Sequence, residues 1–232
     1  MKFWQLVTTV AALVFSAIAN SAIIDQTTFT NTSFGAGAVG TTIGAPGDPD
    51  RIIEASQTVT SGVRGYLSQV DVWVGRQSDT VDDLILTIFD TDISSYPSNA
   101  LGSFSISSSQ IASTSLFTFL MVSIDVSSAN LLFDVGESFA IGLSAPDAPL
   151  SSIASYWTPY SWGLQGSNPY LDGARYVREL QNGTSWNISG TADQAVRTWV
   201  EPAAVPIPAT VWLFFSGLVG LFSFARPISI NR

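Results

Sequence analysis

Hydrophobic and polar residues alternate with a period of two along much of the middle of the chain. The clearest example is the segment 66–74. One face of an extended strand there carries Tyr66, Ser68, Val70, Val72 and Val74, and the other carries Gln69, Asp71 and Trp73. Such alternation predicts an antiparallel strand with one face turned toward a core. No stretch between residues 23 and 204 shows the period of an amphipathic helix.

Further short runs rich in β-branched and aromatic residues are separated by Gly, Pro, Asn and Ser, as strands are separated by turns. These runs are residues 51–60, 84–89, 101–107, 116–126, 138–144, 152–158, 174–180, 185–188 and 195–200. Nine or ten short strands predict an all-β fold, an antiparallel β-sandwich of jelly-roll type. The glycine-rich stretch 34–50 predicts a long loop, and tight turns are predicted at Asn182-Gly183 and at residues 134–137.

The N-terminal end of the chain is hydrophobic. Lys2 precedes an apolar run that ends in Ala17-Ile18-Ala19, with small residues where signal peptidase requires them. This order predicts a cleaved signal peptide over residues 1–22, with signal peptidase as a partner and Ala17 and Ala19 at the cleavage site. The alternative is a retained membrane helix, which the short run and the small residues at its end disfavour.

The C-terminal end is also hydrophobic. Residues 209–225 carry no charge, and seventeen residues are near the lower limit for a transmembrane helix. Trp212 lies near the outer end of this run, and Arg226 follows it on the side expected to be cytoplasmic. Just before the run, Val205-Pro206-Ile207-Pro208 favours an extended backbone that fits a protease cleft.

The order of these C-terminal features resembles the PEP-CTERM sorting signal of Gram-negative bacteria, which exosortase enzymes process. The residues that carry the resemblance are Val205, Pro206, Ile207, Pro208, Ala209, Trp212, Ser216, Gly217 and Arg226. It covers residues 205–232, with Ile207 where the family has Glu and with a thin basic tail. The resemblance implies export, a transient stay in the inner membrane, and cleavage near Pro206 to Pro208 by an exosortase-like enzyme. The product then reaches the cell surface or the extracellular matrix of a biofilm. The alternative is a plain C-terminal membrane anchor.

The segments before this signal are similar in order to the choice-of-anchor ectodomains of bacterial surface proteins, in particular to the type R form. The similarity rests on residues 67–75, 83–90, 139–144, 182–186 and 195–200. It spans about residues 52–200 and implies a fold more than an activity. The chain is therefore expected to comprise a signal peptide (1–22), an ectodomain (23–204) and a sorting segment (205–232).

Composition narrows the functions that remain. The 232 residues include no Cys and no His, which excludes thiol chemistry and imidazole as a general base. Within residues 25–201, six arginines against eighteen acids give a formal charge of −12, which disfavours a nucleic-acid partner. Adjacent Asp82 and Asp83 on a strand point to opposite faces and do not form a catalytic pair. The sequence predicts a protein that is not an enzyme, and the alternative is a hydrolase that uses carboxylates alone.

Two binding hypotheses remain open. Aromatic rings beside polar groups suit a carbohydrate-binding module for extracellular polysaccharide, and the candidates are Trp157, Tyr160, Trp162 and Tyr170. The alternative is that these rings fill the core of the sandwich. Turn acids suit calcium, the one cofactor considered, and the candidates are Asp48, Asp50, Asp90 and Asp92. The alternative is that these are solvated loop carboxylates.

Overall fold

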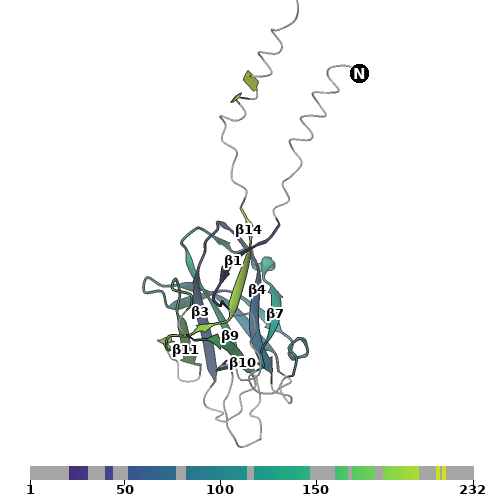
Figure 1. Cartoon of the computed structure of the whole chain (residues 1–232), viewed down its shortest axis with the longest axis vertical. Coiled ribbons are helices and arrows are strands. Elements are labelled where there is room, and N and C mark those ends of the chain that lie inside the picture. The colour runs from purple at the N-terminus through teal and green to yellow at the C-terminus, as the bar shows by residue number, and fades with distance from the viewer. Residues whose placement is uncertain are drawn as a thin grey trace, which may run out of the picture. The chain divides into compact units, whose positions relative to one another are not determined.

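The computed structural model describes residues 21–30, 40–43, 52–76, 82–113, 118–146, 160–166, 169–180, 185–203, 213–214 and 216–217. The chain divides into two units, Met1–Pro202 and Ala203–Arg232, and each is treated by itself. The described part of the first unit is built almost wholly from strands, which form two antiparallel sheets (Figure 1). The predicted all-β fold is confirmed.

The first sheet is organised around one long strand, β4 (Gly65–Arg76). Its other strands are β1 (Ile23–Thr27), β2 (Gly40–Ile43), β7 (Leu120–Asp125), β8 (Leu132–Phe133), β10 (Tyr160–Gln165), β13 (Asp193–Gln194) and β14 (Val196–Pro202). Val72 of β4 pairs with Val196 of β14 and with Val122 of β7, so these two strands lie on opposite sides of β4. β10 continues the β14 side, because Trp162 pairs with Val74 opposite β7.

The second sheet follows the order β12-β11-β3-β9-β5-β6, and all of its neighbours are antiparallel. Its strands are β3 (Ile53–Thr60), β5 (Leu84–Thr91), β6 (Pro97–Ile106), β9 (Ser138–Ser144), β11 (Arg175–Glu179) and β12 (Asn187–Ile188). Two single-turn helices, η1 (Ser108–Gln110) and η2 (Ser127–Ala129), lie in the connections.

The main hydrophobic core takes alternate residues from both sheets, as in a β-sandwich. Leu84, Leu86 and Ile88 of β5 are buried there, whereas Phe89 belongs to a separate cluster. The segment 84–89 is therefore apolar on both faces, as the sequence predicted. Burying such side chains supplies most of the stability of a domain of this kind.

A β-bulge interrupts the alternation predicted for β4. Trp199 pairs with Gln69 but the next residue, Val200, pairs with Leu67, so β4 carries one extra residue. Leu67 is consequently buried and Tyr66 is 39% exposed. The prediction that Tyr66 shares a face with Val70 was wrong, because one inserted residue reverses the side chains that precede it.

A second difference concerns the glycine-rich stretch 34–50, which was predicted to be a loop. Residues 40–43 form strand β2, which pairs with β10 through Ile43 and Tyr160. Pairing with an existing edge, rather than local alternation, makes this segment a strand. The turn predicted at residues 134–137 is confirmed: the Glu137 N–H donates to the Asp134 carbonyl, and Gly136 has a φ of 84°. The Asn182-Gly183 turn and the run 152–158 lie outside the described residues.

Among the described residues, no helix is long and apolar enough to span a membrane. Most of the predicted segment 209–225 is outside them. The four residues of it that are described, Leu213, Phe214, Ser216 and Gly217, are helical and exposed.

Candidate functional site

The first and last strands of the first unit lie side by side. β1 and β14 are antiparallel, and Ile23 pairs with Val200 (Figure 1). The side chain of Thr28 strengthens this edge, because its Oγ1 accepts a hydrogen bond from the Val196 N–H at 3.0 Å. The chain therefore enters and leaves the domain at the same place. We call this region, with the strand ends and turns beside it, the terminal end.

Close backbone contact sets the width of the terminal end. Pro202 of β14 pairs with Gly65 of β4, and Tyr66 pairs with Leu132 of β8. A Cβ atom on Gly65 would lie 2.5 Å from the Glu201 carbonyl oxygen, so the approach of β14 to β4 requires glycine. The strands β1, β14, β4 and β8 thus lie in one row at this end.

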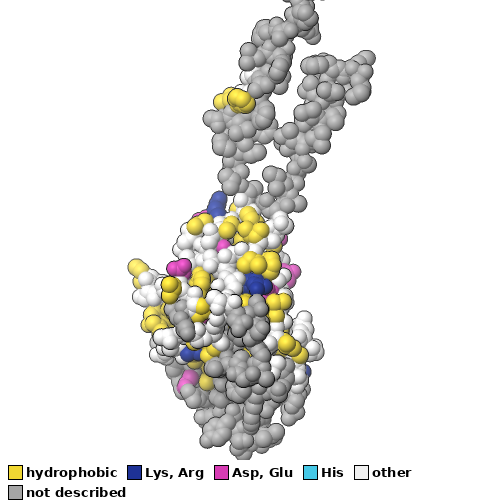
Figure 2. Space-filling view, viewed as in Figure 1, with side chains coloured by type: hydrophobic (Ala, Val, Ile, Leu, Met, Phe, Trp, Pro, Cys, Tyr) yellow, Lys and Arg dark blue, Asp and Glu magenta, His cyan; other side chains and the backbone are white. Residues whose placement is uncertain are grey.

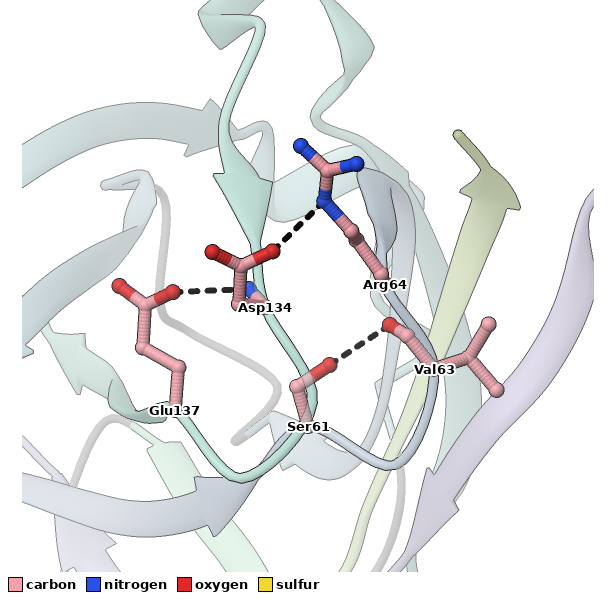
Figure 3. Close-up of polar contacts among 5 residues, drawn as sticks. All are labelled: Ser61, Val63, Arg64, Asp134 and Glu137. Atoms are coloured by element: carbon pink, nitrogen blue, oxygen red, sulfur yellow. Dashed lines mark hydrogen bonds and ion pairs between the residues drawn. The ribbon is translucent and has the colours of Figure 1, made fainter. Parts of the chain in front are cut away.

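Two turns are joined beside this row (Figure 3). The Ser61 N–H donates to the Glu137 carbonyl, and Ser61 Oγ donates to the Val63 carbonyl at 2.9 Å. Arg64 Nε lies 2.6 Å from Asp134 Oδ1, and the Asp134 N–H donates to Glu137 Oε2 at 2.8 Å. The β3–β4 and β8–β9 turns, residues 61–64 and 134–137, are therefore fixed against each other.

Asp25 ties β1 to the first of these turns. Its Oδ1 accepts hydrogen bonds from the backbone N–H groups of Gly62 at 2.9 Å and Val63 at 2.8 Å. Burial raises the pKa of the Asp25 carboxyl, although these two hydrogen bonds act to lower it. Asp25 lies where the pairing of β1 with β14 shifts register, between Ile24 and Gln26.

Large apolar side chains are exposed at the terminal end. They are Ile23 (40%), Ile24 (48%), Tyr66 (39%), Leu132 (39%) and Val135 (66%). Figure 2 shows hydrophobic side chains at this end of the domain, with charged ones among them, and further hydrophobic side chains along both sides of the same view. Contiguous exposed apolar side chains of this kind are typical of interaction sites.

The outer face of the first sheet carries a cluster around Arg197. Its members are Phe29, Gln69, Asp71, Trp73, Arg197 and Trp199. The Arg197 guanidinium lies 5.4 Å from the centre of the Trp73 ring, within range of a cation–π interaction. The Asp71 carboxylate, 1% exposed, accepts hydrogen bonds from Trp199 Nε1 at 2.8 Å and Gln69 Nε2 at 2.7 Å, with Arg197 Nη1 3.9 Å away.

The outer face of the second sheet carries a cluster around Arg178. Its members are Glu54, Phe89, Tyr176, Arg178 and Trp186. Arg178 Nε donates to Glu54 Oε2 at 2.6 Å, and the guanidinium lies 4.3 Å from the centre of the Trp186 ring. Burial raises the pKa of the Glu54 carboxyl more than Arg178 lowers it.

Three of the four aromatic candidates for sugar binding lie in the main core. Tyr160, Trp162 and Tyr170 are 1%, 0% and 8% exposed, which corresponds to the core-filling alternative. Trp162 Nε1 donates to the Ala195 carbonyl at 3.1 Å, and burial raises the pKa of Tyr160 to about 12. Trp157 lies outside the described residues.

Two of the four calcium candidates, Asp90 and Asp92, lie among the described residues. Asp92 Oδ1 accepts hydrogen bonds from the N–H groups of Ser94 at 2.8 Å and Tyr96 at 2.9 Å, so it closes the β5–β6 turn, and Asp90 is exposed at the end of β5. The part of the chain that the structure describes contains no group of three or more acidic side chains placed to hold a metal ion. Asp48 and Asp50 lie outside it.

The sorting and cleavage candidates are mostly outside the described residues. These are Ala17, Ala19, Val205, Pro206, Ile207, Pro208, Ala209, Trp212 and Arg226. Ser216 and Gly217 are helical, and Ser216 Oγ donates to the Leu213 carbonyl at 2.9 Å. Their role in sorting stays a prediction.

Sequence reasoning did not identify Asp25, Glu54 or Arg178. A signal was present for the last two, since each is a charged residue inside a run that reads as a half-buried strand. The sequence does not show that β3 and β11 are neighbours, and so it does not show that Glu54 pairs with Arg178. No protein-family model and no curated protein matches this chain.

Proposed function

We propose that this chain is an exported, non-enzymatic surface or extracellular-matrix protein whose β-domain is sorted through its C-terminal segment by an exosortase-like enzyme. The observation that carries this proposal is the pairing of β1 with β14. Because the domain begins and ends at one place, a signal peptide before β1 and an anchor after β14 would both be joined to the same end of the domain.

The spacing of the C-terminal features supports the same function. Pro202 is the last residue of β14, and Val205 begins the Val-Pro-Ile-Pro motif two residues beyond Ala203. The motif thus follows the folded domain directly and precedes the apolar run. The two prolines of this motif favour an extended backbone, which is the substrate shape that a protease cleft accepts.

The test is mass spectrometry of the protein from cell envelope and medium, in strains with and without the processing enzyme. We expect a mature form that ends near Pro206 to Pro208 and that disappears when the enzyme is deleted. P206A/P208A should block processing, and Pro227→Ala, beyond Arg226, should not. An intact C-terminus at Arg232 in both strains would make the segment a plain membrane anchor.

A second candidate function is polysaccharide binding on the outer face of the first sheet. It draws on one observation: the exposed Tyr66 ring and the partly exposed Trp199 indole lie on the face that also carries the carboxylate of Asp125. Rings beside hydrogen-bonding groups suit sugar stacking. A glycan array with the protein and with its Y66A/W199A variant tests it, and an identical binding profile for the two would remove this candidate.

A further inference from the structure

The apolar side chains at the terminal end extend from the first sheet onto the turns of the second. Among the described residues of the first unit, the three most exposed large hydrophobic side chains are Ile93 (104%), Leu171 (83%) and Val135 (66%). Ile93 lies in the β5–β6 turn, after Thr91, whose Oγ1 donates to the Ser138 carbonyl at 2.9 Å at the start of β9. Val135 lies in the turn just before β9.

Leu171 lies beside the same strand ends. It stands between Tyr170, whose hydroxyl accepts the Thr60 N–H at 2.9 Å, and Asp172, whose carbonyl accepts from Thr60 Oγ1 at 2.9 Å. Thr60 is the last residue of β3. Three turns or loops at one end of the sheets thus each expose an aliphatic side chain. Ile23, Ile24 and Leu132 add three more, and Tyr66 adds an aromatic ring. Seven of the eleven exposed large hydrophobic side chains in the described part of the first unit therefore lie at this end, a concentration that is typical of an interaction surface.

We propose that the terminal end docks into the interfacial layer of the bilayer that holds the C-terminal segment. This inference rests on the proposed function, because the sorting segment supplies the membrane. Six residues, 203–208, separate the end of β14 from the apolar run. Extended, they span at most about 20 Å. The tether therefore keeps the surface within reach of the lipid headgroups, where a tyrosine and aliphatic side chains are favoured.

The charge of the terminal end determines which lipid headgroups it prefers. Six acids are exposed there, against the exposed guanidinium of Arg64, which is already paired with Asp134. These acids are Asp90, Asp92, Asp134, Glu137, Asp172 and Glu201. This balance favours zwitterionic over anionic headgroups. Docking would also fix the height of Val205 to Pro208 above the membrane, and so present the cleavage motif at a constant distance from a membrane enzyme.

The absence of cysteine from the chain makes the test direct, because one introduced thiol carries one label. The full-length precursor is placed in phosphatidylcholine nanodiscs with an environment-sensitive fluorophore at Leu132→Cys or Val135→Cys. Met121→Cys and Ile188→Cys, on exposed side chains of β7 and β12, are the matched controls. Nitroxide lipids should quench the first pair at least about twofold more than the controls. Added anionic lipid should reduce that difference.

A label at Leu213→Cys, in the apolar segment, tests the membrane-held precursor separately from docking of the domain. Quenching at position 213 with equal, weak quenching at 132, 135, 121 and 188 would overturn membrane docking and leave the sorting proposal intact. The emission of a label at 132 or 135 could instead report an apolar environment while lipid nitroxides do not quench it. That result would show contact with a protein surface, such as a second copy, and would also overturn membrane docking. An unquenched label at 213 would refute the membrane-held precursor itself.

Discussion

The outer faces of the two sheets each contain a buried carboxylate, and the two carboxylates have different hydrogen-bond partners. Each buries a carboxylate beside an arginine that lies over aromatic rings. In the Arg197 cluster, Asp71 is held chiefly by the neutral donors of Trp199 and Gln69, and Arg197 stays 3.9 Å away. In the Arg178 cluster, Glu54 relies on Arg178 at 2.6 Å.

The difference concerns how a buried charge is made tolerable. The Asp71 carboxylate accepts hydrogen bonds from Trp199 and Gln69, so the loss of one donor leaves the other in place. Glu54 depends on one guanidinium, and removing it leaves an uncompensated buried charge, which costs far more than an exposed ion pair is worth. The two clusters should therefore respond very differently to matched substitutions.

The largest effect is expected for Arg178→Met. It should lower the free energy of unfolding by about 3 kcal/mol, because Glu54 is 3% exposed and loses its charged partner. Urea titration measures this. The control is Arg64→Met, whose ion pair with Asp134 has side chains 54% and 69% exposed, and which should cost about 0.5 kcal/mol. Equal losses for the two variants would contradict the dependence of Glu54 on Arg178.

A smaller effect is expected for Trp199→Phe, at about 2 kcal/mol, since the indole N–H hydrogen bond to Asp71 is lost. Trp186→Phe is the matched change in the other cluster. Trp186 Nε1 has no hydrogen-bond partner among the described residues, so only the ring contact with Arg178 changes. In thermal unfolding, the melting temperature should therefore decrease more for Trp199→Phe than for Trp186→Phe. The reverse order would refute the role assigned to the Trp199 indole.

Arg197→Met should cost still less, about 1 kcal/mol, because Asp71 keeps both neutral donors and methionine still packs against the Phe29 and Trp73 rings. Measured beside Arg178→Met by the same urea titration, it gives the sharpest form of the comparison. A loss as large as that of Arg178→Met would mean that Asp71 depends on the distant guanidinium after all.

The smallest effect is a pH dependence that comes from Glu54 in the Arg178 cluster. Burial raises the pKa of Glu54 above its ordinary value of 4.5, so the folded protein binds this proton more readily than the unfolded chain. From pH 4.5 up to the raised pKa, the free energy of unfolding should therefore fall as the pH rises. Glu54→Gln should remove this contribution, while those of Asp25 and Asp193, whose pKa values are also raised, remain. Parallel stability curves for wild type and variant would contradict the assignment.

Much of the fold was readable from the sequence, and the site was not. The strands β3, β5 and β9 coincide closely with the predicted runs, because alternation and β-branched composition act within a few neighbouring residues. The strands β1, β2 and β10 and the bulge in β4 were missed, since each is defined by its partner strand. The same holds for the terminal end, where Gly65 is required only because Glu201 passes it.

By itself the sequence determined the all-β class, the alternating core positions and the hydrophobic ends. These are local properties, fixed by residue type and spacing. The tertiary structure alone decided that β1 lies beside β14, that Arg178 meets Glu54 across 124 residues of chain, and that exposed apolar turns gather at one end. The physical reason is that strand order and register minimise the free energy of whole sheets, and no local window of sequence contains that information.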